Sequence, residues 1–373
     1  MADTVAIPQQ PAAHSGLSGA VAERVLEIHD LHVHFYTQLG IVRAVNGVSL
    51  SIPRGKVLGV VGESGCGKSI TALSILQLVP PPGKIVAGRI LFWDKGAAQP
   101  VNLLDYDRHS PQMRSIRGGK ISMIFQEPMT SLNPCYTIGD QIMEAILLHQ
   151  TPHRSEAKAR AIEILRRVGM PNPERVFAMY PHQLSGGMRQ RAMIAMALSC
   201  TPELLIADEP TTALDVTTEA QILDLMRELQ QEFAMSILYV THNLGVVAQM
   251  CDEVVVMYLG RIVERATVEE LFYDPKHPYT MALLRSIPRL GAQRKIHLQV
   301  ISGNVPDPYS VVPGCPFHPR CPSAMPGICD RLVPVETFVD GTGRHGVRCH
   351  LYPGSTVEGT ADQTAVATPT APS

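Results

Sequence analysis

Residues 62–69 combine the residue types that bind phosphate groups. They read Gly-Glu-Ser-Gly-Cys-Gly-Lys-Ser and directly follow the apolar run Val57–Val61, whose branched side chains predict a buried strand. Glycines let the backbone curl so that successive N–H groups point at phosphate oxygens, and a helix that begins near Lys68 adds its positive dipole end. An ordinary glycine-rich turn is the alternative, but strand, loop, Lys-Ser pair and apolar helix occur in the order that phosphate binding requires.

Two side chains of this phosphate loop can act directly on a nucleotide. Lys68 can reach the β- and γ-phosphates, and the hydroxyl of Ser69 is suited to bind magnesium. The segment therefore predicts a nucleotide site, although it indicates no particular function on its own. The nucleotide-binding residues that we expect here are Gly62, Glu63, Ser64, Gly65, Cys66, Gly67, Lys68, Ser69 and Ile70.

Two neighbouring acids follow the apolar run Leu204–Ala207, which we expect to be a second buried strand. Side chains at the carboxyl end of a parallel strand face the crevice where ligands bind. Asp208 would hold the magnesium ion, directly or through water, and Glu209 would polarise the water that attacks the γ-phosphate. A solvated pair of acids is the alternative, but the position of this pair favours hydrolysis of a nucleoside triphosphate.

The segment from Leu184 to Gln190 reads Leu-Ser-Gly-Gly-Met-Arg-Gln and precedes a helix-forming run that ends at Leu198. It matches the signature motif of the ATP-binding cassette (ABC) proteins, and the chain resembles that family. The resemblance implies that the signature faces the phosphate loop of a second subunit, so that two chains enclose each nucleotide. The residues expected to act across that dimer are Ser185, Gly186, Gly187 and Gln190.

The resemblance extends to three further polar residues in the order that the family shows. Gln126 resembles the loop glutamine that contacts magnesium and senses the membrane partner, and Asp215 resembles the aspartate that crosses the dimer. His242 resembles the switch histidine that contacts the γ-phosphate. The implied catalytic residues are Lys68, Gln126, Glu209 and His242, and the implied magnesium ligands are Ser69, Gln126 and Asp208.

An aromatic side chain near the start of the domain is expected to stack on the adenine ring. The candidates are Phe35 and Tyr36, which follow one another in the sequence. Leu31, Val33 and Phe35 alternate along one strand and therefore share one of its faces. This pattern favours Phe35 as the residue that stacks on adenine.

These motifs require a fold that brings the ends of several strands together. Alternating strand-like and helix-like patterns run from Val25 to about Ile287, and helix-forming residues fill Asp140–Gly169. We expect an α/β fold: a P-loop nucleotide-hydrolase cassette with a mixed sheet core, a helical subdomain and a small cysteine-rich C-terminal appendage. The expected boundaries are a disordered segment at 1–22, the nucleotide-binding domain at 23–287 with its helical subdomain at about 127–190, the C-terminal region at 288–352 and a disordered tail at 353–373.

Two segments near the C-terminus indicate a branch of the family. Asp274-Pro-Lys-His-Pro-Tyr-Thr and Pro313-Gly-Cys-Pro-Phe-His-Pro-Arg-Cys resemble the C-terminal extension of oligopeptide and dipeptide importer subunits, a branch that includes nickel importers. The resemblance implies an ATP-hydrolysing motor subunit of a peptide importer. Import of nickel or another small solute is one alternative, and a non-transport ABC ATPase is another. The implied partners are a homologous second ATPase subunit in a heterodimer, two transmembrane permeases and an extracytoplasmic solute-binding protein.

Four of the eight cysteines lie close together in the C-terminal region. Because cytosolic thiols are kept reduced, a metal site is favoured over disulfides. The gaps of five, seven and nineteen residues contain no closely spaced pair typical of zinc and match no ferredoxin spacing. Members of the importer branch carry an iron–sulfur cluster, so the resemblance favours [4Fe-4S], with zinc or free thiols as alternatives. The four cysteines are Cys315, Cys321, Cys329 and Cys349.

Composition argues against several other classes of protein. The 32 basic residues nearly cancel the 34 acidic ones, so no nucleic-acid partner is expected. The apolar runs are far shorter than the roughly 20 residues that cross a bilayer, and the first twenty residues lack the pattern of a secretion signal. We therefore expect a peripheral protein on the cytoplasmic face of the cell (inner) membrane, with ATP and Mg²⁺ as cofactors.

Overall fold

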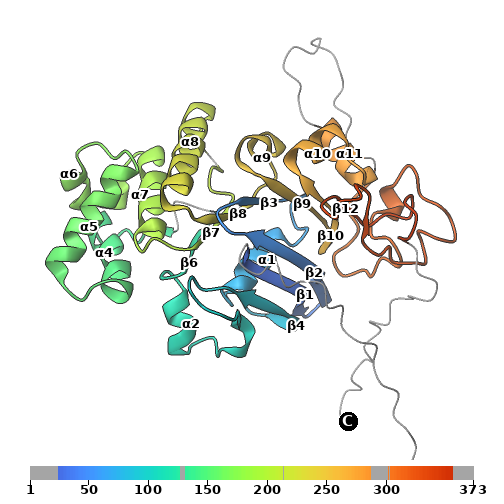
Figure 1. Ribbon diagram of the computed structural model, residues 1–373, viewed down its shortest axis with the longest axis horizontal. Coiled ribbons are helices and arrows are strands. Elements are labelled where there is room, and N and C mark those ends of the chain that lie inside the picture. The colour runs from blue at the N-terminus through green and yellow to red at the C-terminus, as the bar shows by residue number, and fades with distance from the viewer. Residues whose placement is uncertain (1–23, 127–130, 213, 287–300, 302, 356–373) are drawn as a thin grey trace, which may run out of the picture.

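The computed structural model describes residues 24–126, 131–212, 214–286, 301 and 303–355. Two sheets lie at its centre, a group of helices lies on one side, and the C-terminal region lies on the other (Figure 1). The segments expected to be disordered, 1–22 and 353–373, fall outside these residues apart from 353–355. No helix among the described residues is both long and apolar enough to cross a membrane.

The larger sheet has eight strands in the order β11-β12-β10-β9-β3-β8-β7-β6. The five strands from β9 to β6 run parallel. Parallel strands that are covered on both faces are continuous apolar runs, and β3 and β7 are buried along their whole length. The parallel strands are β3 (Val57–Val61), β6 (Ile121–Ile124), β7 (Leu204–Asp208), β8 (Ser236–Val240) and β9 (Glu253–Tyr258).

The smaller sheet is antiparallel, with the order β2-β1-β4-β5. Helix α1 (Lys68–Ile75) packs between the two sheets, since one apolar cluster contains Val33 of the smaller sheet, Ile75 of α1 and Val60 of β3. This arrangement places the start of α1 at the end of β3. The strands are β1 (Arg24–Thr37), β2 (Gly40–Pro53), β4 (Gly83–Phe92) and β5 (Val101–Asn102).

A group of helices extends from the β6 side of the larger sheet, drawn in green in Figure 1. Its helix α4 begins after Thr137, whose hydroxyl accepts a hydrogen bond from the N–H of Asp140. The apolar faces of these helices share one core with β7 and β8. The helices are α4 (Ile138–His149), α5 (Arg154–Arg167), α6 (Pro173–Phe177) and α7 (Gly186–Leu198).

The remaining helices connect or cover the strands of the two sheets. Along the chain, α8 lies between β7 and β8, and α9 lies between β8 and β9. Helices α10 and α11 follow β10. Their bounds, with those of the short 3-10 turns, are α2 (Pro111–Ile116), α8 (Val216–Phe233), α9 (Leu244–Met250), α10 (Val268–Tyr273), α11 (Pro278–Arg285), η2 (Leu103–Asp105), η3 (Pro181–Gln183) and η4 (His318–Arg320).

The C-terminal region is joined to the larger sheet and is not a separate appendage. Strand β10 (Arg261–Thr267) pairs antiparallel with both β9 and β12 (Gly346–Val347), and β11 (Thr337–Phe338) completes the sheet edge. Phe317 and Cys329 belong to the same apolar cluster as Val256 of β9. The expectation of an appendage is corrected in this respect, because the region buries its few apolar side chains against the sheet.

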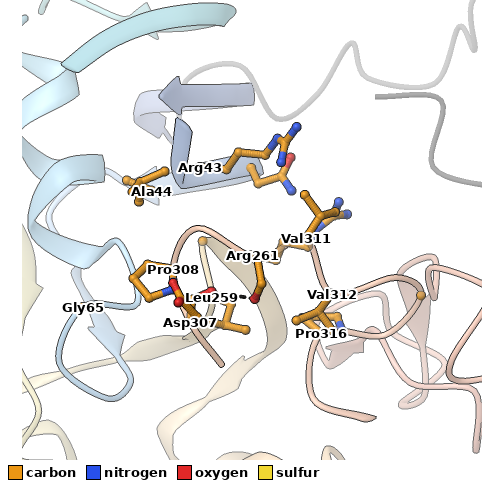
Figure 2. Close-up of a pocket in the computed structure, with 15 residues that line it drawn as sticks. Arg43, Ala44, Gly65, Leu259, Arg261, Asp307, Pro308, Val311, Val312 and Pro316 are labelled. Atoms are coloured by element: carbon orange, nitrogen blue, oxygen red, sulfur yellow. Dashed lines mark hydrogen bonds between the residues drawn. The ribbon is translucent and has the colours of Figure 1, made fainter. Parts of the chain in front are cut away.

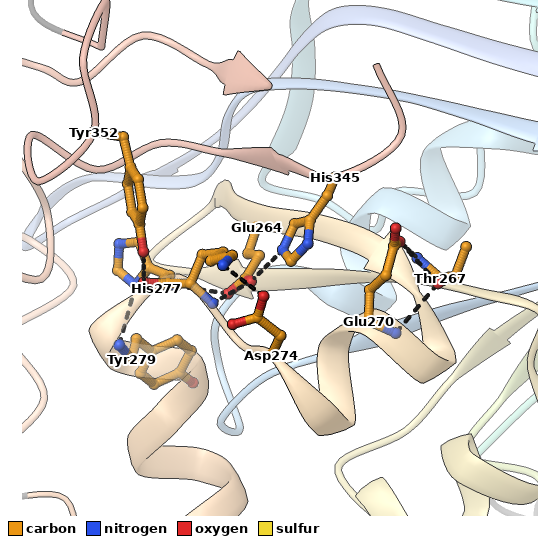
Figure 3. Close-up of polar contacts among 9 residues, drawn as sticks. Glu264, Thr267, Glu270, Asp274, His277, Tyr279, His345 and Tyr352 are labelled. Carbon is orange, nitrogen blue, oxygen red and sulfur yellow. Dashed lines mark hydrogen bonds and ion pairs between the residues drawn. The ribbon is translucent and has the colours of Figure 1, made fainter. Parts of the chain in front are cut away.

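At the β10 edge of the larger sheet, the buried carboxylate of Glu264 contacts both the His-Pro-Tyr-Thr segment and the C-terminal region (Figure 3). Glu264 of β10 is fully buried and accepts hydrogen bonds from the backbone N–H groups of Lys276 and His277, at 2.7 and 2.9 Å. Nε2 of His345 lies 2.8 Å from the same carboxylate. Because a buried charge is stable only when it is paired, Glu264 ties the His-Pro-Tyr-Thr segment and the C-terminal region to one strand.

Candidate functional site

The phosphate loop connects β3 to α1, as the sequence predicts, and glycine is required at two of its positions. A Cβ atom on Gly62 would lie 2.2 Å from the carbonyl oxygen of Met257, and one on Gly67 would lie 2.2 Å from that of Ala44. Gly67 also has φ of 100°, which side chains disfavour. The loop can therefore curl tightly against β2 and the end of β9 only because these residues have no side chain.

Lys68 and Ser69 occupy the first turn of α1. Nζ of Lys68 donates hydrogen bonds to the carbonyl oxygens of Gly62 (2.8 Å) and Glu63 (3.1 Å), and the Ser69 hydroxyl donates to Oδ1 of Asp208 (3.0 Å). A cavity of about 230 Å³ opens beside them. Its lining brings together Ala44, Ser64, Gly65, Gly67, Lys68, Ser69, Ile70, Gln126 and Glu209.

Glu209 lies at the centre of a hydrogen-bonded group at the ends of three neighbouring strands. Gln126 follows β6 and donates from Nε2 to Oε2 of Glu209 at 2.9 Å. His242 follows β8, and its Nδ1 lies 3.0 Å from Oε1. The hydroxyl of Thr212 donates to Oε2 at 3.2 Å. The structure thus brings together residues that are far apart in the sequence, at the sheet edge where their motifs place them.

The two adjacent acids have opposite pKa shifts because their surroundings differ. Burial, reinforced by the charge of Glu209, raises the pKa of Asp208 to about 6, although the Ser69 hydroxyl opposes the shift. Burial also acts to raise the pKa of Glu209, but its contacts with His242 and Thr212 and the charge of Lys68 outweigh burial and lower it. The contacts of Glu209 therefore favour its ionised form.

The signature residues lie outside this cavity, at the start of α7. Ser185 caps the helix by accepting a hydrogen bond from the N–H of Met188, and it is exposed to solvent. Asp215 caps α8 through its bond to the N–H of Thr218, and a Cβ on Gly187 would lie 2.9 Å from the Thr218 methyl group. The signature and the start of α8 therefore form one exposed surface. Ser185, Gly186 and Gly187 are absent from the lining of their own chain's phosphate-loop cavity.

Gln190 is placed differently from the other signature residues. It is fully buried, and its side-chain amide donates to the carbonyl oxygen of Pro210. In this structure the side chain therefore connects α7 to the loop that follows Glu209, and it does not face solvent where a partner could reach it.

The two candidates for adenine stacking lie on opposite faces of β1. Phe35 is partly buried in the core, and its ring lies within 2.8 Å of where a Cβ of Gly83 would be. Tyr36 is 45% exposed, with Nζ of Lys84 5.8 Å from its ring centroid. Neither residue lines the cavity beside Lys68, so the choice between them stays a prediction.

The sequence matches two family models. The model described as ABC transporter matches residues 45–212, and the model described as oligopeptide/dipeptide transporter, C-terminal region, matches residues 263–329. The dipeptide transport ATP-binding protein DppD of Bacillus subtilis is 50% identical over 333 residues, which cover 88% of this chain and 95% of that protein. The chain belongs to the ABC transporter ATP-binding family. The probable peptide ABC transporter ATP-binding protein y4tR of Sinorhizobium fredii is 51% identical over 85% of this chain and 92% of its own.

Solved ABC structures have the same fold. The dimeric bacterial ABC transporter cassette MJ0796 superposes with a TM-score of 0.56 at 26% identity, over 65% of this chain and 98% of its own. The subunit cbiO1 from Clostridium perfringens, part of the ABC transporter complex cbiONQ, gives 0.56 at 27% identity over 68% and 92%. These matches confirm the predicted P-loop ABC cassette fold with its mixed sheet.

The four cysteines of this ABC protein's C-terminal region come from separate turns and have no disulfide bonds. Burial raises the pKa of the Cys315 thiol to about 12, with smaller contributions from Cys349, Cys329 and Cys321 in that order. The backbone N–H of Cys315 donates to the carbonyl oxygen of Cys329 at 2.8 Å, so these two residues are neighbours in space. Within the described ranges, however, no group of three or more His, Cys, Asp or Glu side chains is arranged to hold a metal ion.

Sequence reasoning missed the side-chain role of Glu63, which it treated only as a phosphate-loop residue. The guanidinium of Arg320 forms an ion pair with the Glu63 carboxylate at 2.8 Å. Arg320 belongs to the Phe-His-Pro-Arg-Cys segment, and the sequence assigned that segment to a branch of the family without assigning its residues a task. The presence of an arginine in this segment could have suggested an ion pair, but nothing in the sequence indicates that its partner is Glu63.

Proposed function

We propose that this ABC protein is one of two ATP-hydrolysing motor subunits of an importer that moves di- or oligopeptides across the cell membrane. The observation that carries the proposal is the placement of an ionised Glu209, held by Gln126, Thr212 and His242, beside the cavity that contains Lys68. The C-terminal region of the oligopeptide/dipeptide type and the similarity to a dipeptide transport ATP-binding protein support a peptide as the transported solute.

Each polar residue of the site has a separate task in this proposal. Lys68 and the N–H groups of the phosphate loop would bind the phosphates, and Glu209 would orient the attacking water while His242 contacts the γ-phosphate. Ser69, Gln126 and Asp208 would hold magnesium, which would neutralise phosphate charge. The hydroxyl of Ser69 and the carboxylate of Asp208 lie 3.0 Å apart, and such oxygen donors suit this ion.

A second subunit would complete the site. The exposure of Ser185 and its absence from its own chain's cavity support a dimer in which the signature acts on the other chain's nucleotide. We propose a heterodimer with a homologous ATPase subunit, bound to two transmembrane permeases on the cytoplasmic face of the inner membrane. A solute-binding protein on the other side of the membrane would deliver the peptide.

The four C-terminal cysteines support a cofactor proposal. We propose that Cys315, Cys321, Cys329 and Cys349 bind a [4Fe-4S] cluster, which takes four cysteine thiolates. The cysteines carry no disulfides, and four thiols are the kind and number of donors that such a cluster takes. Zinc is the alternative ion for the same four thiolates, and no arrangement of three or more such ligands for either metal is formed by the described residues. When bound, the cluster would cross-link the turns that contribute the cysteines.

Replacement of Glu209 by Gln tests the motor function. The amide keeps the size of the side chain but loses the negative charge, so ATP hydrolysis by the assembled complex should fall at least about a hundredfold while nucleotide binding is retained. Peptide uptake should stop in the same variant. The exposed Glu228 of α8 is a matched control, and Glu228→Gln should keep the full rate. Wild-type hydrolysis by Glu209→Gln would refute the role of this carboxylate.

A further inference from the structure

Two residues from the segment that matches the oligopeptide/dipeptide C-terminal region contact Glu63 of the phosphate loop. Neither of the two lines the nucleotide cavity. The N–H of Glu63 donates to the hydroxyl oxygen of Tyr279 at 2.9 Å. Its carboxylate accepts from both terminal nitrogens of Arg320, at 2.8 and 3.2 Å. Two parallel bonds between a guanidinium and a carboxylate fix orientation as well as distance. Glu63 is therefore bound at its backbone and at its side chain by the same part of the chain.

Arg320 is nearly buried, and its interaction with Glu63 has little competition from water. The exposed fraction of its side chain is 4%, against 27% for Glu63. The hydrogen bonds that Arg320 donates to Glu63 raise the pKa of Arg320 above its ordinary range, and the Tyr258 hydroxyl lies 3.4 Å from Nη1. A buried cation that loses its carboxylate is left without compensation for the water it gave up. This ion pair is therefore a stronger constraint than one on the surface.

A cluster of three aromatic side chains lies beside Arg320. Phe317 precedes Arg320 by one turn and lies edge-on to Tyr258, with ring centroids 5.2 Å apart. Tyr279 completes the cluster, at 4.7 Å from Tyr258 and 5.3 Å from Phe317. Phe317, Tyr258 and Tyr279 are all fully or almost fully buried. Arg320 is thus packed against the end of β9 and the start of α11.

The neighbouring surface of the loop also faces the C-terminal region (Figure 2). A hollow of about 110 Å³ is lined by Gly65 of the loop, by Gly260 after β9 and by Asp307 and Pro308 of the C-terminal region. The N–H of Gly260 donates to the carbonyl oxygen of Cys66 at 2.9 Å. This hollow adjoins the nucleotide cavity, which Gly65 also lines, and residues from beyond β9 border it.

Glu63 is also bonded to the lysine that would contact the phosphates. Nζ of Lys68 donates to the carbonyl oxygens of Glu63 and of the preceding Gly62. The peptide groups on both sides of the Glu63 Cα thus accept hydrogen bonds from the Lys68 ammonium. Tyr279 and Arg320 in turn fix the position of Glu63. A continuous chain of contacts runs from Arg320 through Glu63 to Lys68.

We propose that Arg320 is a positioning residue of the nucleotide site, through which the C-terminal region holds Glu63 and Lys68 in the arrangement that binds phosphate. The proposal rests on nucleotide binding by the phosphate loop and adds that nucleotide affinity depends on the packing of the C-terminal region. Arg320 touches no substrate in this role, since it acts through Glu63.

The test measures equilibrium binding of MgADP to the full chain by titration calorimetry. Arg320→Gln should bind MgADP about tenfold more weakly than the wild type, since one set of bonds that preorganise the loop is lost. Arg331→Gln, which changes an exposed arginine of the same region, should bind as the wild type does. Unchanged MgADP affinity in Arg320→Gln, with or without a lower melting temperature, would overturn the proposal.

A double-mutant cycle separates positioning from a general loss of stability. Glu63→Gln should weaken MgADP binding to a similar degree, and the double variant should be no worse than either single variant, because both changes break one contact. In the assembled complex, Arg320→Gln should raise KM for ATP more than it lowers kcat. Additive losses in the cycle, or a loss of kcat alone, would contradict the proposed path through Glu63. If the wild type itself bound no MgADP, the proposed motor function would fail instead.

Discussion

At the scale of single residues, two adjacent acids illustrate how position changes chemistry. Asp208 is the last residue of a buried strand, and Glu209 has φ of 47°, in a region that side chains seldom adopt. This turn of the backbone points the two carboxylates into different surroundings. Asp208 meets the Ser69 hydroxyl, whereas Glu209 meets a ring nitrogen, an amide and a hydroxyl. The two acids therefore have different contacts, although they are adjacent in the sequence.

His277 is a second residue whose surroundings decide its ionisation, and it predicts a pH dependence of stability. Burial lowers the pKa of His277 to about 4, although the charge of Glu264 opposes the shift. The neutral ring is needed, because its Nδ1 accepts a hydrogen bond from the N–H of Tyr279. In the unfolded chain the pKa would be about 6.5. The folded state therefore binds fewer protons between these two values, so stability rises with pH in that window.

Because of His277, the free energy of unfolding should decrease by about 3 kcal/mol in total as the pH falls from about 6.5 toward 4. Above about pH 6.5 this residue should cause no further change. Denaturant unfolding at several pH values measures this decrease. His277→Asn removes the titrating group and should flatten the fall of the unfolding free energy across this window relative to the wild type. Exposed His182 on η3 provides the control, since His182→Asn should leave the slope unchanged. Equal slopes in His277→Asn and wild type would contradict the assignment.

At the scale of secondary-structure elements, α7 presents its N-terminus to solvent. Its cap Ser185 and the cap of α8, Asp215, lie on one surface with Gly187. A helix N-terminus carries unpaired N–H groups and a partial positive charge, which suit a phosphate. Nothing in the phosphate-loop cavity of the same chain uses this end of the helix.

Ser185→Arg tests whether that helix end acts on a second chain. The bulky side chain should block the opposed phosphate loop, so hydrolysis at the partner's site should fall at least tenfold while MgADP still binds to the variant's own loop. Loss of the cap should cost about 1 kcal/mol of stability. The measurement is the ATPase rate of complexes in which only one of the two ATPase subunits carries the change. Full activity at both sites would refute the sandwich arrangement.

The sequence predicts some elements well because their signals are local. β3, β7 and the loops that follow them combine an apolar run with a motif within about a dozen residues, and both were located correctly. The strands β11 and β12 have two residues each, too few to show any alternation. The pair Arg320 and Glu63 is separated by 257 residues and has no local pattern. What could not be predicted was therefore the long-range pairing that joins the C-terminal region to the sheet.

At the scale of the whole molecule, the C-terminal region extends the sheet on one side and supports the phosphate loop on the other. β12 adds to β10, and Phe317 packs on the end of β9. The region contributes few apolar side chains, so its stability must depend on these contacts and on cross-links between its turns. The proposed cluster would supply such a connection.

Purification without oxygen followed by metal analysis tests the cluster. The wild type should contain about four irons per chain, and Cys321→Ser should lose most of the iron and make residues 303–355 more sensitive to protease. Cys200 is a buried cysteine of the nucleotide domain, and Cys200→Ser should keep the iron. One zinc per chain would assign the same cysteines to a different metal, and four titratable thiols without metal would refute both assignments.

The bond between Glu264 and His345 joins two residues that are synthesised at different times. The two residues are 81 positions apart, which at ribosomal rates corresponds to an interval of about 4 to 16 s. Throughout that interval the outer edge of β10 has no neighbouring strand, and an open strand edge can pair with another nascent chain. Newly made chains are therefore most exposed to misassembly after β10 has emerged and before residues 345–347 arrive to close the sheet.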